Sequence, residues 1–270
     1  MRRRRELVGF AGVVAVLLLA CQLVPRPGAG LGNTIRGSGK IAQEERAVGD
    51  FRGVELATIG TLHIEVGERE SLRIQAEDNL LPYFQTTVRG ETLVIDVQNG
   101  INLRTTRPVD YTLTVVDLES IALSSSGNAE APDLESKLFT VQVSSSGGLK
   151  MGDLTCDTFR VTISSSGDVS VGQVNGQRLE AELGSSGGLT VAGGAVERQE
   201  VQISSSGNYT AQGLQSQEAD VQLSSSGSAT ISVAERLTAS LSSSGNLRYA
   251  GNPRTDVTTS SSGNVIHISE

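Results

Sequence analysis

The residues of this 270-residue chain that could do chemistry are its many serines, its two histidines and a set of evenly spaced carboxylates. A serine nucleophile requires a base held beside it. His63 and His267 stand far apart in the chain, and neither has a cysteine or carboxylate at the spacing of a zinc site. We therefore predict that the protein is not an enzyme, and we assign no catalytic residue, no metal site and no cofactor.

Three carboxylates recur at one interval, at Glu180, Glu200 and Asp220. If they stack about 4.8 Å apart, they repel one another unless they bind a hard cation such as calcium or pair with basic neighbours such as Arg160. The simplest interpretation is a solvated acidic face that deters aggregation. The alternative is a polysaccharide-active enzyme that uses this carboxylate column. Such enzymes set their acids in clefts walled by long loops, and the repeats have no insertions to build them.

The interval comes from a tetrapeptide, Ser-Ser-Ser-Gly, which starts at residues 124, 144, 164, 204, 224, 242 and 260, and at 184 with glycine in the first place. A period near 20 is typical of a solenoid. Apolar residues alternate on both sides of the turn, such as Val141 and Val143 before it and Leu149 and Met151 after it. This pattern predicts two strands of one coil around a shared interior. The fold class is therefore all-β, a parallel β-helix with about 20 residues per coil.

Alternation also gives each serine of the tetrapeptide a direction. The middle serine is predicted to face inward and the outer two to face solvent, with these roles exchanged if the corner starts earlier. The glycine and its successor tolerate left-handed backbone at the corner. We name the outward serines the serine edge and predict that they bind carbohydrate or a protein, unless the motif is only a structural bend. The members of the serine edge are Ser144, Ser146, Ser164, Ser166, Ser204, Ser206, Ser224 and Ser226.

Residues 41–120 alternate apolar and polar residues without the serine repeat, as in Leu62-His-Ile-Glu-Val66. This period of two predicts half-buried strands. A stacked β-solenoid exposes unpaired backbone at its ends. We therefore expect residues 41–120 to form an N-terminal β cap, with some irregular coils of its own, and residues 121–270 to form the repeat solenoid.

The first 20 residues have the character of a signal peptide, with Arg2 to Arg5 followed by an apolar run that is too short to span a bilayer. The sequence Leu18-Leu19-Ala20-Cys21 resembles a bacterial lipobox, so we predict acylation of Cys21 and anchoring to a membrane. Residues 21–40 are rich in Pro and Gly and read as a flexible tether. The protein is then expected in the cell envelope. The remaining cysteine, Cys156, occupies a column of small residues and is expected to pack in the interior.

The formal net charge is −8. An acidic chain without a basic stripe cannot neutralise many phosphates, so we expect no nucleic-acid partner. The sequence stops three residues after His267, the last position of inward type. We expect this last coil either to associate with another copy of the chain or to be weakly ordered.

The ordered pattern of short motifs resembles a known family. The motifs are Phe51-x-x-Val54-x-Leu56, Gly60-x-Leu62-x-Ile64, Ser71-Leu72-x-Ile74-x-Ala76, Asn79-Leu80-Leu81, Leu93-x-Ile95 and the later Leu-Ser-Ser-Ser-Gly-Asn, as at Leu123–Asn128. This order resembles the family called putative auto-transporter adhesin, head GIN domain. The resemblance implies a right-handed β-helix on a bacterial envelope protein without catalytic residues. The predicted function is a lipid-anchored scaffold or adhesin-like binding module.

Overall fold

The computed structural model describes residues 33–242, 244–260 and 262–269, which belong to one compact unit. The predicted signal peptide, Cys21 and the tether as far as residue 32 lie outside the described residues. The N-terminal strands are β1 (Asn33–Arg36), β2 (Ile41–Arg46), β3 (Gly53–Leu56), β4 (Thr61–Val66), β5 (Ser71–Glu77), β6 (Phe84–Arg89), β7 (Thr92–Val97), β8 (Ile101–Arg104) and β9 (Asp110–Val115), with the 3-10 helix η1 at Leu81–Tyr83.

The strands of the repeats follow without a helix between them in the described part of the chain. They are β10 (Ser120–Leu123), β11 (Asn128–Ala131), β12 (Leu134–Val143), β13 (Leu149–Met151), β14 (Leu154–Ile163), β15 (Asp168–Leu183), β16 (Gly188–Ile203), β17 (Asn208–Leu223), β18 (Ser228–Leu241), β19 (Asn246–Ala250), β20 (Arg254–Thr259) and β21 (Asn264–His267).

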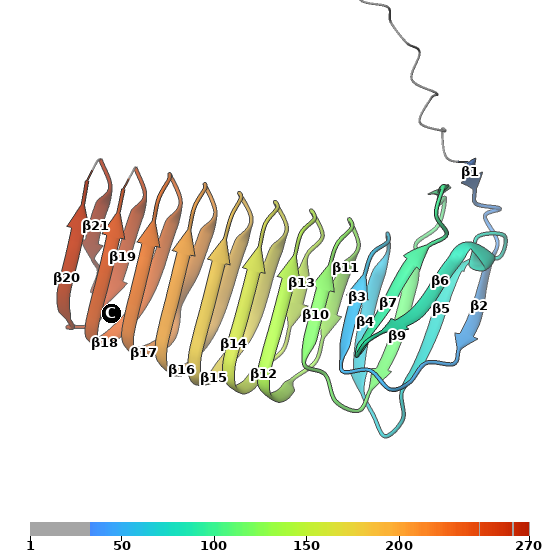
Figure 1. Ribbon diagram of the computed structural model, residues 1–270, viewed down its shortest axis with the longest axis horizontal. Helices are drawn as coiled ribbons and strands as arrows, with labels where there is room; N and C mark the ends of the chain where they lie inside the picture. Colours follow the sequence, from blue (N-terminus) through green and yellow to red (C-terminus); the bar gives the residue numbers. More distant parts are fainter. Residues whose placement is uncertain (1–32, 243, 261, 270) are drawn as a thin grey trace, which may run out of the picture. The chain divides into compact units, whose positions relative to one another are not determined.

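The repeats stack as parallel coils, one beside the next (Figure 1). Val141 of β12 lies beside Val161 of β14, and Val161 lies beside Ala181 of β15, so the register advances by one 20-residue period at each coil. Strands before the tetrapeptides form one flank of the stack, strands after them form the other, and the tetrapeptide turns join the two flanks. The predicted parallel β-solenoid is confirmed.

The core is a narrow column of aliphatic side chains between the two flanks. The residues predicted to face inward on either side of the turn, such as Val141, Val143 and Leu149, are buried. Cys156 is buried as well, and burial, with a smaller effect of the Asp157 charge, raises the pKa of its thiol to about 11. In the last coil Val257 and Val265 are only half-buried. Apolar burial therefore weakens towards β20 and β21.

The glycine of each tetrapeptide is required by close approach of neighbouring coils, and the prediction of a left-handed backbone is wrong for it. A Cβ atom on Gly147 would lie 1.9 Å from the carbonyl oxygen of Gly127, and one on Gly187 would lie 2.2 Å from that of Gly167. The glycines with positive φ are found elsewhere in the described chain, for example Gly194 at 108°. The turns can therefore stack only because their inward-facing residue lacks a side chain.

The residue after this glycine links neighbouring coils. Asn128 Oδ1 accepts a 2.8 Å hydrogen bond from the backbone N–H of Gly148, and Asp168 Oδ1 accepts one of the same length from Gly188. The residue that donates the N–H is glycine in both cases, and its lack of a side chain leaves room for the accepting side chain. These side chains satisfy backbone donors at the corner and help to hold the coils in register.

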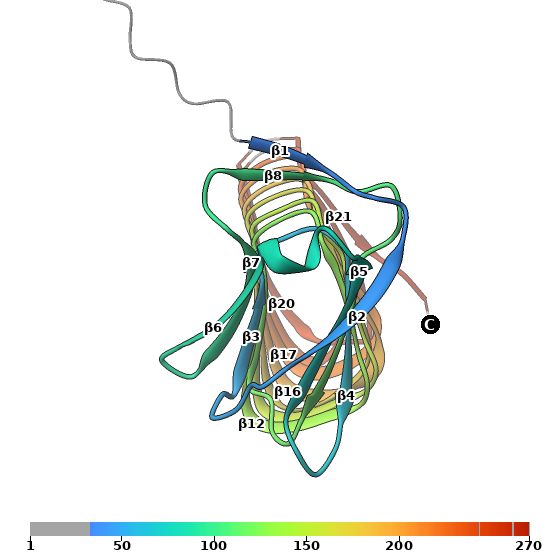
Figure 2. The same cartoon turned by 90° about the vertical axis from the view of Figure 1, so that its right-hand side faces the viewer.

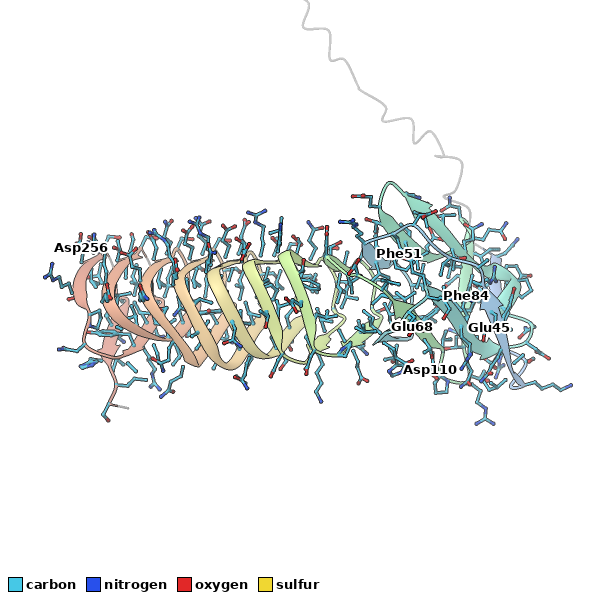
Figure 3. All side chains as sticks on the ribbon, turned by 90° about the horizontal axis from the view of Figure 1, so that it is seen from below. Glu45, Phe51, Glu68, Phe84, Asp110 and Asp256 are labelled. Carbon is cyan, nitrogen blue, oxygen red and sulfur yellow. The ribbon has the colours of Figure 1, made fainter. Side chains whose placement is uncertain are left out.

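The N-terminal part adds two coils to the same stack, but not in chain order. Strand β3 lies between β7 and β10, and β4 lies between β9 and β11. Beyond these coils, β6 pairs antiparallel with β7, and β5 pairs antiparallel with β9 and β2 (Figure 2). Phe51 and Phe84 (Figure 3) are buried here, and the ring of Phe84 meets Tyr111 edge-on at 5.8 Å. That these antiparallel strands cap the solenoid stays a prediction.

Strand β1 lies within the range predicted to be a tether. It pairs in parallel with β8 to form a separate two-stranded sheet, in which Ile35 lies beside Leu103 and Arg36 beside Arg104. Ile35 and Leu103 pack against the hydrophobic core. The described chain is therefore ordered as β-structure from Asn33, earlier than its Pro/Gly composition indicates.

The close contact between coils predicts that two glycines of one turn differ strongly in how much their replacement by alanine destabilises the fold. Gly187→Ala places a methyl group against the carbonyl of Gly167 and should lower the free energy of unfolding by about 1–3 kcal/mol. Gly184→Ala is the matched control, because the nearest atom to its Cβ lies 3.8 Å away. Chemical denaturation of both variants measures the effect, and equal midpoints would contradict this account of the turn.

Candidate functional site

The eight predicted members of the serine edge are all exposed, and they lie on the tips of the turns that run along one edge of the stack (Figure 1). The middle serines, such as Ser145, are half-buried, as alternation predicts. The hydroxyl of Ser145 donates to the carbonyl of Leu123 on the preceding coil at 3.4 Å, and that of Ser144 donates to the same atom at 3.5 Å. The outer serines therefore offer stacked hydroxyl groups to solvent.

A shallow groove of about 210 Å³ runs beside the serine edge on the flank formed by β16, β17 and β18. Its polar lining consists of exposed amide and hydroxyl groups, which both donate and accept hydrogen bonds. We call it the Gln–Ser groove. Its polar lining residues are Gln202, Ser204, Gln222, Ser224, Ser240 and Ser242. Ser204 and Ser224 thus belong both to the groove and to the predicted binding face.

The predicted carboxylate column exists, and arginines lie between its members. Glu180 lies beside Glu200, and Glu200 beside Asp220, on successive coils. Glu180 accepts a 2.7 Å hydrogen bond from Arg160 Nε, and Glu200 Oε1 lies 2.8 Å from Arg198 Nε. Pairing with basic neighbours, one of the two arrangements considered for this column, is thus present, and calcium binding stays a prediction.

Arg198 is surrounded by acidic groups on two neighbouring coils. Besides Glu200, its guanidinium lies 3.1 Å from Glu218 and 3.9 Å from Asp220. No cluster of three or more His, Cys, Asp or Glu side chains among the described residues has the geometry to hold a metal ion. The arrangement is an ion-pair ladder that ties coil to coil, and it engages the carboxylates that an enzyme would need free.

The two histidines lie in different surroundings. His63 Nδ1 is 3.2 Å from Glu130 Oε2, and its Nε2 is 3.8 Å from Asp110 Oδ1, so the ring bridges three neighbouring strands. His267 stacks on Tyr249 with 4.9 Å between ring centres. No serine hydroxyl is hydrogen-bonded to either ring in the described chain. The histidines therefore link strands and are not placed to activate a nucleophile.

Sequence reasoning missed a buried polar network inside the solenoid. Gln199 stands in a column of mostly apolar residues and is fully buried. Its Nε2 donates to Ser216 Oγ at 2.8 Å and to the carbonyl of Ser232 at 3.1 Å, and its Oε1 accepts from the hydroxyl of Tyr209 at 3.0 Å. The pairing of β17 with β18 shifts register here, where the coil shortens. The network satisfies polar groups at that irregularity, and the polar residue in an apolar column was the available signal.

A second missed residue is Glu77, whose side chain is fully buried in the N-terminal part. Its carboxylate accepts hydrogen bonds from the N–H of Gly39 at 2.6 Å, the hydroxyl of Thr106 at 2.6 Å and the N–H of Thr106 at 2.8 Å. These bonds, led by that from the Thr106 hydroxyl, lower the pKa of Glu77. Glu77 thus links residues 37–40 to residues 104–107 by hydrogen bonds. A contact between segments so far apart in the sequence leaves no short-range sequence pattern.

The sequence of the chain matches a known protein family. Residues 50–253 match the family described as putative auto-transporter adhesin, head GIN domain. The chain belongs to this family. The resemblance stated from its motifs is thereby confirmed, and no curated protein matches the chain. The described residues contain no helix long and apolar enough to cross a bilayer.

Solved structures share the fold of this family member. A putative adhesin from Parabacteroides distasonis is 18% identical, with a TM-score of 0.79 over 87% of this chain and 100% of its own. One from Parabacteroides merdae is 19% identical, with a TM-score of 0.80 over 87% and 99%. A putative lipid binding protein from Parabacteroides distasonis is 22% identical, with a TM-score of 0.74 over 87% and 100%. At these identities the likeness concerns the fold alone.

The Glu77 contacts predict a pH-dependent contribution to stability. Because the pKa of Glu77 is lowered in the folded chain, its contribution is complete at neutral pH and is lost as the pH falls below about 4, the range of an ordinary carboxyl group. Glu77→Gln should lower the urea midpoint at pH 7, and the difference from the parent chain should shrink in acid. Glu68→Gln, at an exposed carboxylate, is the control. A pH-independent loss in Glu77→Gln would contradict the role of charge.

Proposed function

We propose that the protein is a non-enzymatic, adhesin-like binding module of the bacterial cell envelope, held to a membrane by acylated Cys21. Its family and two of its solved neighbours carry adhesin names, which supports binding at the cell surface. The ligand of the Gln–Ser groove and the adjoining serine edge is a carbohydrate.

The observation that carries the carbohydrate assignment is the chemistry of the Gln–Ser groove. Gln202 and Gln222 stand on neighbouring coils in register, and Ser204 and Ser224 follow them at the turns. Amides and hydroxyls pair with sugar hydroxyls in either sense, as donor or as acceptor. Their repeat from coil to coil, about 4.8 Å, is close to the length of one sugar unit. The groove therefore suits an extended chain of sugars better than a compact ligand.

A surface protein is the other partner predicted for the serine edge. An array of exposed hydroxyl groups provides few of the contacts that make protein interfaces strong. Protein interfaces draw most of their binding energy from buried aromatic and arginine anchors. The lining of the groove contains neither an aromatic residue nor an arginine, and its apolar members are Ile203 and Leu223. Carbohydrate is therefore the better match.

A polysaccharide-active enzyme fits the ion-pair ladder poorly. A general acid needs a raised pKa and a place within reach of the glycosidic oxygen. Glu180 and Glu200 instead lie against Arg160 and Arg198, which hold their carboxylate oxygens in ion pairs on an open flank of the stack. The ladder is better explained by coil-to-coil stabilisation.

Loss of groove hydrogen bonds should weaken glycan binding. In the double variant Gln222→Ala/Ser224→Ala, we expect affinity for the glycans that the parent binds on a printed oligosaccharide array to fall by roughly tenfold or more, about 1 kcal/mol for each hydrogen bond lost. The control Thr190→Ala/Thr210→Ala removes exposed side chains from the other flank. Equal losses in both double variants, or no binding by the parent, would reject the groove as the site.

The lipid anchor has its own test. The parent chain, expressed in a bacterium fed an alkyne-labelled fatty acid, should carry the label and fractionate with membranes. Cys21→Ala should abolish the label, because the acyl acceptor is gone. Label that persists in Cys21→Ala, or its absence from the parent, would rule out acylation at this residue.

A further inference from the structure

The two-stranded sheet β1–β8 carries a pair of arginines on its outer side. Arg36 and Arg104 are register partners in parallel strands, so their side chains leave the sheet on the same side, and both are exposed. The neighbouring pair, Ile35 and Leu103, packs against the core on the other side. Two positive charges are thus held next to each other on a face that has no core to cover.

Two further basic residues flank the contacts of Glu77. Lys40 follows Gly39, and Arg107 follows Thr106, and both are exposed. Because Glu77 accepts hydrogen bonds from both Gly39 and Thr106, the segments that carry Lys40 and Arg107 lie close together. These segments directly follow β1 and β8, which carry Arg36 and Arg104. We call Arg36, Lys40, Arg104 and Arg107 the basic patch.

The charges of the basic patch are not neutralised by the described residues. None of its four side chains forms an ion pair within the described part of the chain, whereas Arg160, Arg178, Arg198 and Arg236 of the solenoid all do. The nearby carboxylates are already engaged, since Glu77 is buried under backbone donors and Asp78 accepts from the hydroxyl of Ser38. The patch therefore presents free positive charge on an acidic protein.

The position of the patch along the chain limits its distance from the lipid anchor. Strand β1 begins at Asn33, which is 12 residues after Cys21 (33 minus 21). Twelve residues span at most roughly 40 Å when fully extended. This step rests on the proposed acylation of Cys21. With Cys21 in the bilayer, the basic patch stays within reach of the lipid headgroups at all times.

We propose that the basic patch docks the protein on anionic lipid headgroups, as a second membrane contact beside the acyl anchor. Acyl chains at Cys21 would hold the protein at the membrane, and a basic cluster nearby would add an electrostatic contact with anionic lipids. Each Lys or Arg near an anionic bilayer strengthens binding about fivefold. The recognised chemistry is phosphate carried by a lipid surface, since Arg36 and Arg104 are register partners on an exposed face.

Vesicle co-sedimentation tests the proposal without the acyl chain. The protein from residue 22 onward, which retains every described residue, is mixed with vesicles of phosphatidylcholine alone or with phosphatidylglycerol added. We expect binding to the anionic vesicles only, decreasing as salt increases. Arg36→Gln/Arg104→Gln should weaken that binding by roughly thirtyfold, with an unchanged urea midpoint to show that the fold is intact.

The control variant is Arg248→Gln/Arg254→Gln, which removes the same charge from exposed positions in β19 and β20, near the other end of the stack (Figure 1). It should bind as the parent does. Equal losses in the two double variants, or equal binding to neutral vesicles, would overturn the proposal. Displacement by inorganic phosphate at constant ionic strength would also overturn it, in favour of a free-phosphate site. Because the acyl group is absent, these outcomes are independent of the fatty-acid labelling of Cys21.

Discussion

Contact between the backbones of neighbouring turns is the constraint on which the rest of this structure depends. A parallel β-solenoid repeats at about 4.8 Å, and at the corner this spacing leaves no room for a Cβ between Gly147 and the carbonyl of Gly127. The same spacing places equivalent residues of successive coils directly beside one another, in columns. A residue type that recurs once per repeat therefore forms a line of identical side chains along the stack, and these columns determine the surface of the repeats.

Columns of one charge are unstable, and the chain resolves them in two ways. On the flank before the turns, Glu180 and Glu200 pair with arginines of the same and of neighbouring coils, so repulsion is converted into ion pairs. At the corners, an aspartate or asparagine such as Asp168 accepts a backbone N–H of the next coil. Asp133 and Asp153, also stacked, bond to the backbone of the next coil in the same way. The acidic composition is thus largely structural, and the serine edge and the Gln–Ser groove remain as uncharged surfaces.

The features that depend on the 20-residue repeat and on the alternation of side chains could be predicted from the sequence. The coil, the inward Val141 and Val143, the buried Cys156 and the outward serines all follow from a repeat of 20 and an alternation of two. Features that depend on contacts between distant segments could not be read. Glu77 meets Gly39 and Thr106 through three separate elements, and β3 is inserted between β7 and β10 against chain order. The role of the tetrapeptide glycine was misassigned because its constraint comes from the adjacent coil and not from its own backbone angles.

The distribution of charge along the stack decides whether an acidic protein can lie on an anionic membrane. The basic patch belongs to the coil of β7 and β9, and Glu180 lies five coil steps away, through β3, β10, β12 and β14 to β15. Five steps amount to roughly 24 Å, more than twice the Debye length of about 8–10 Å at physiological salt. The carboxylates of the ion-pair ladder are therefore too distant to cancel the attraction that we propose between the patch and lipid phosphates. They repel the surface only when the flank that carries them turns towards it, so the same charges that stabilise the coils oppose contact between that flank and an anionic bilayer.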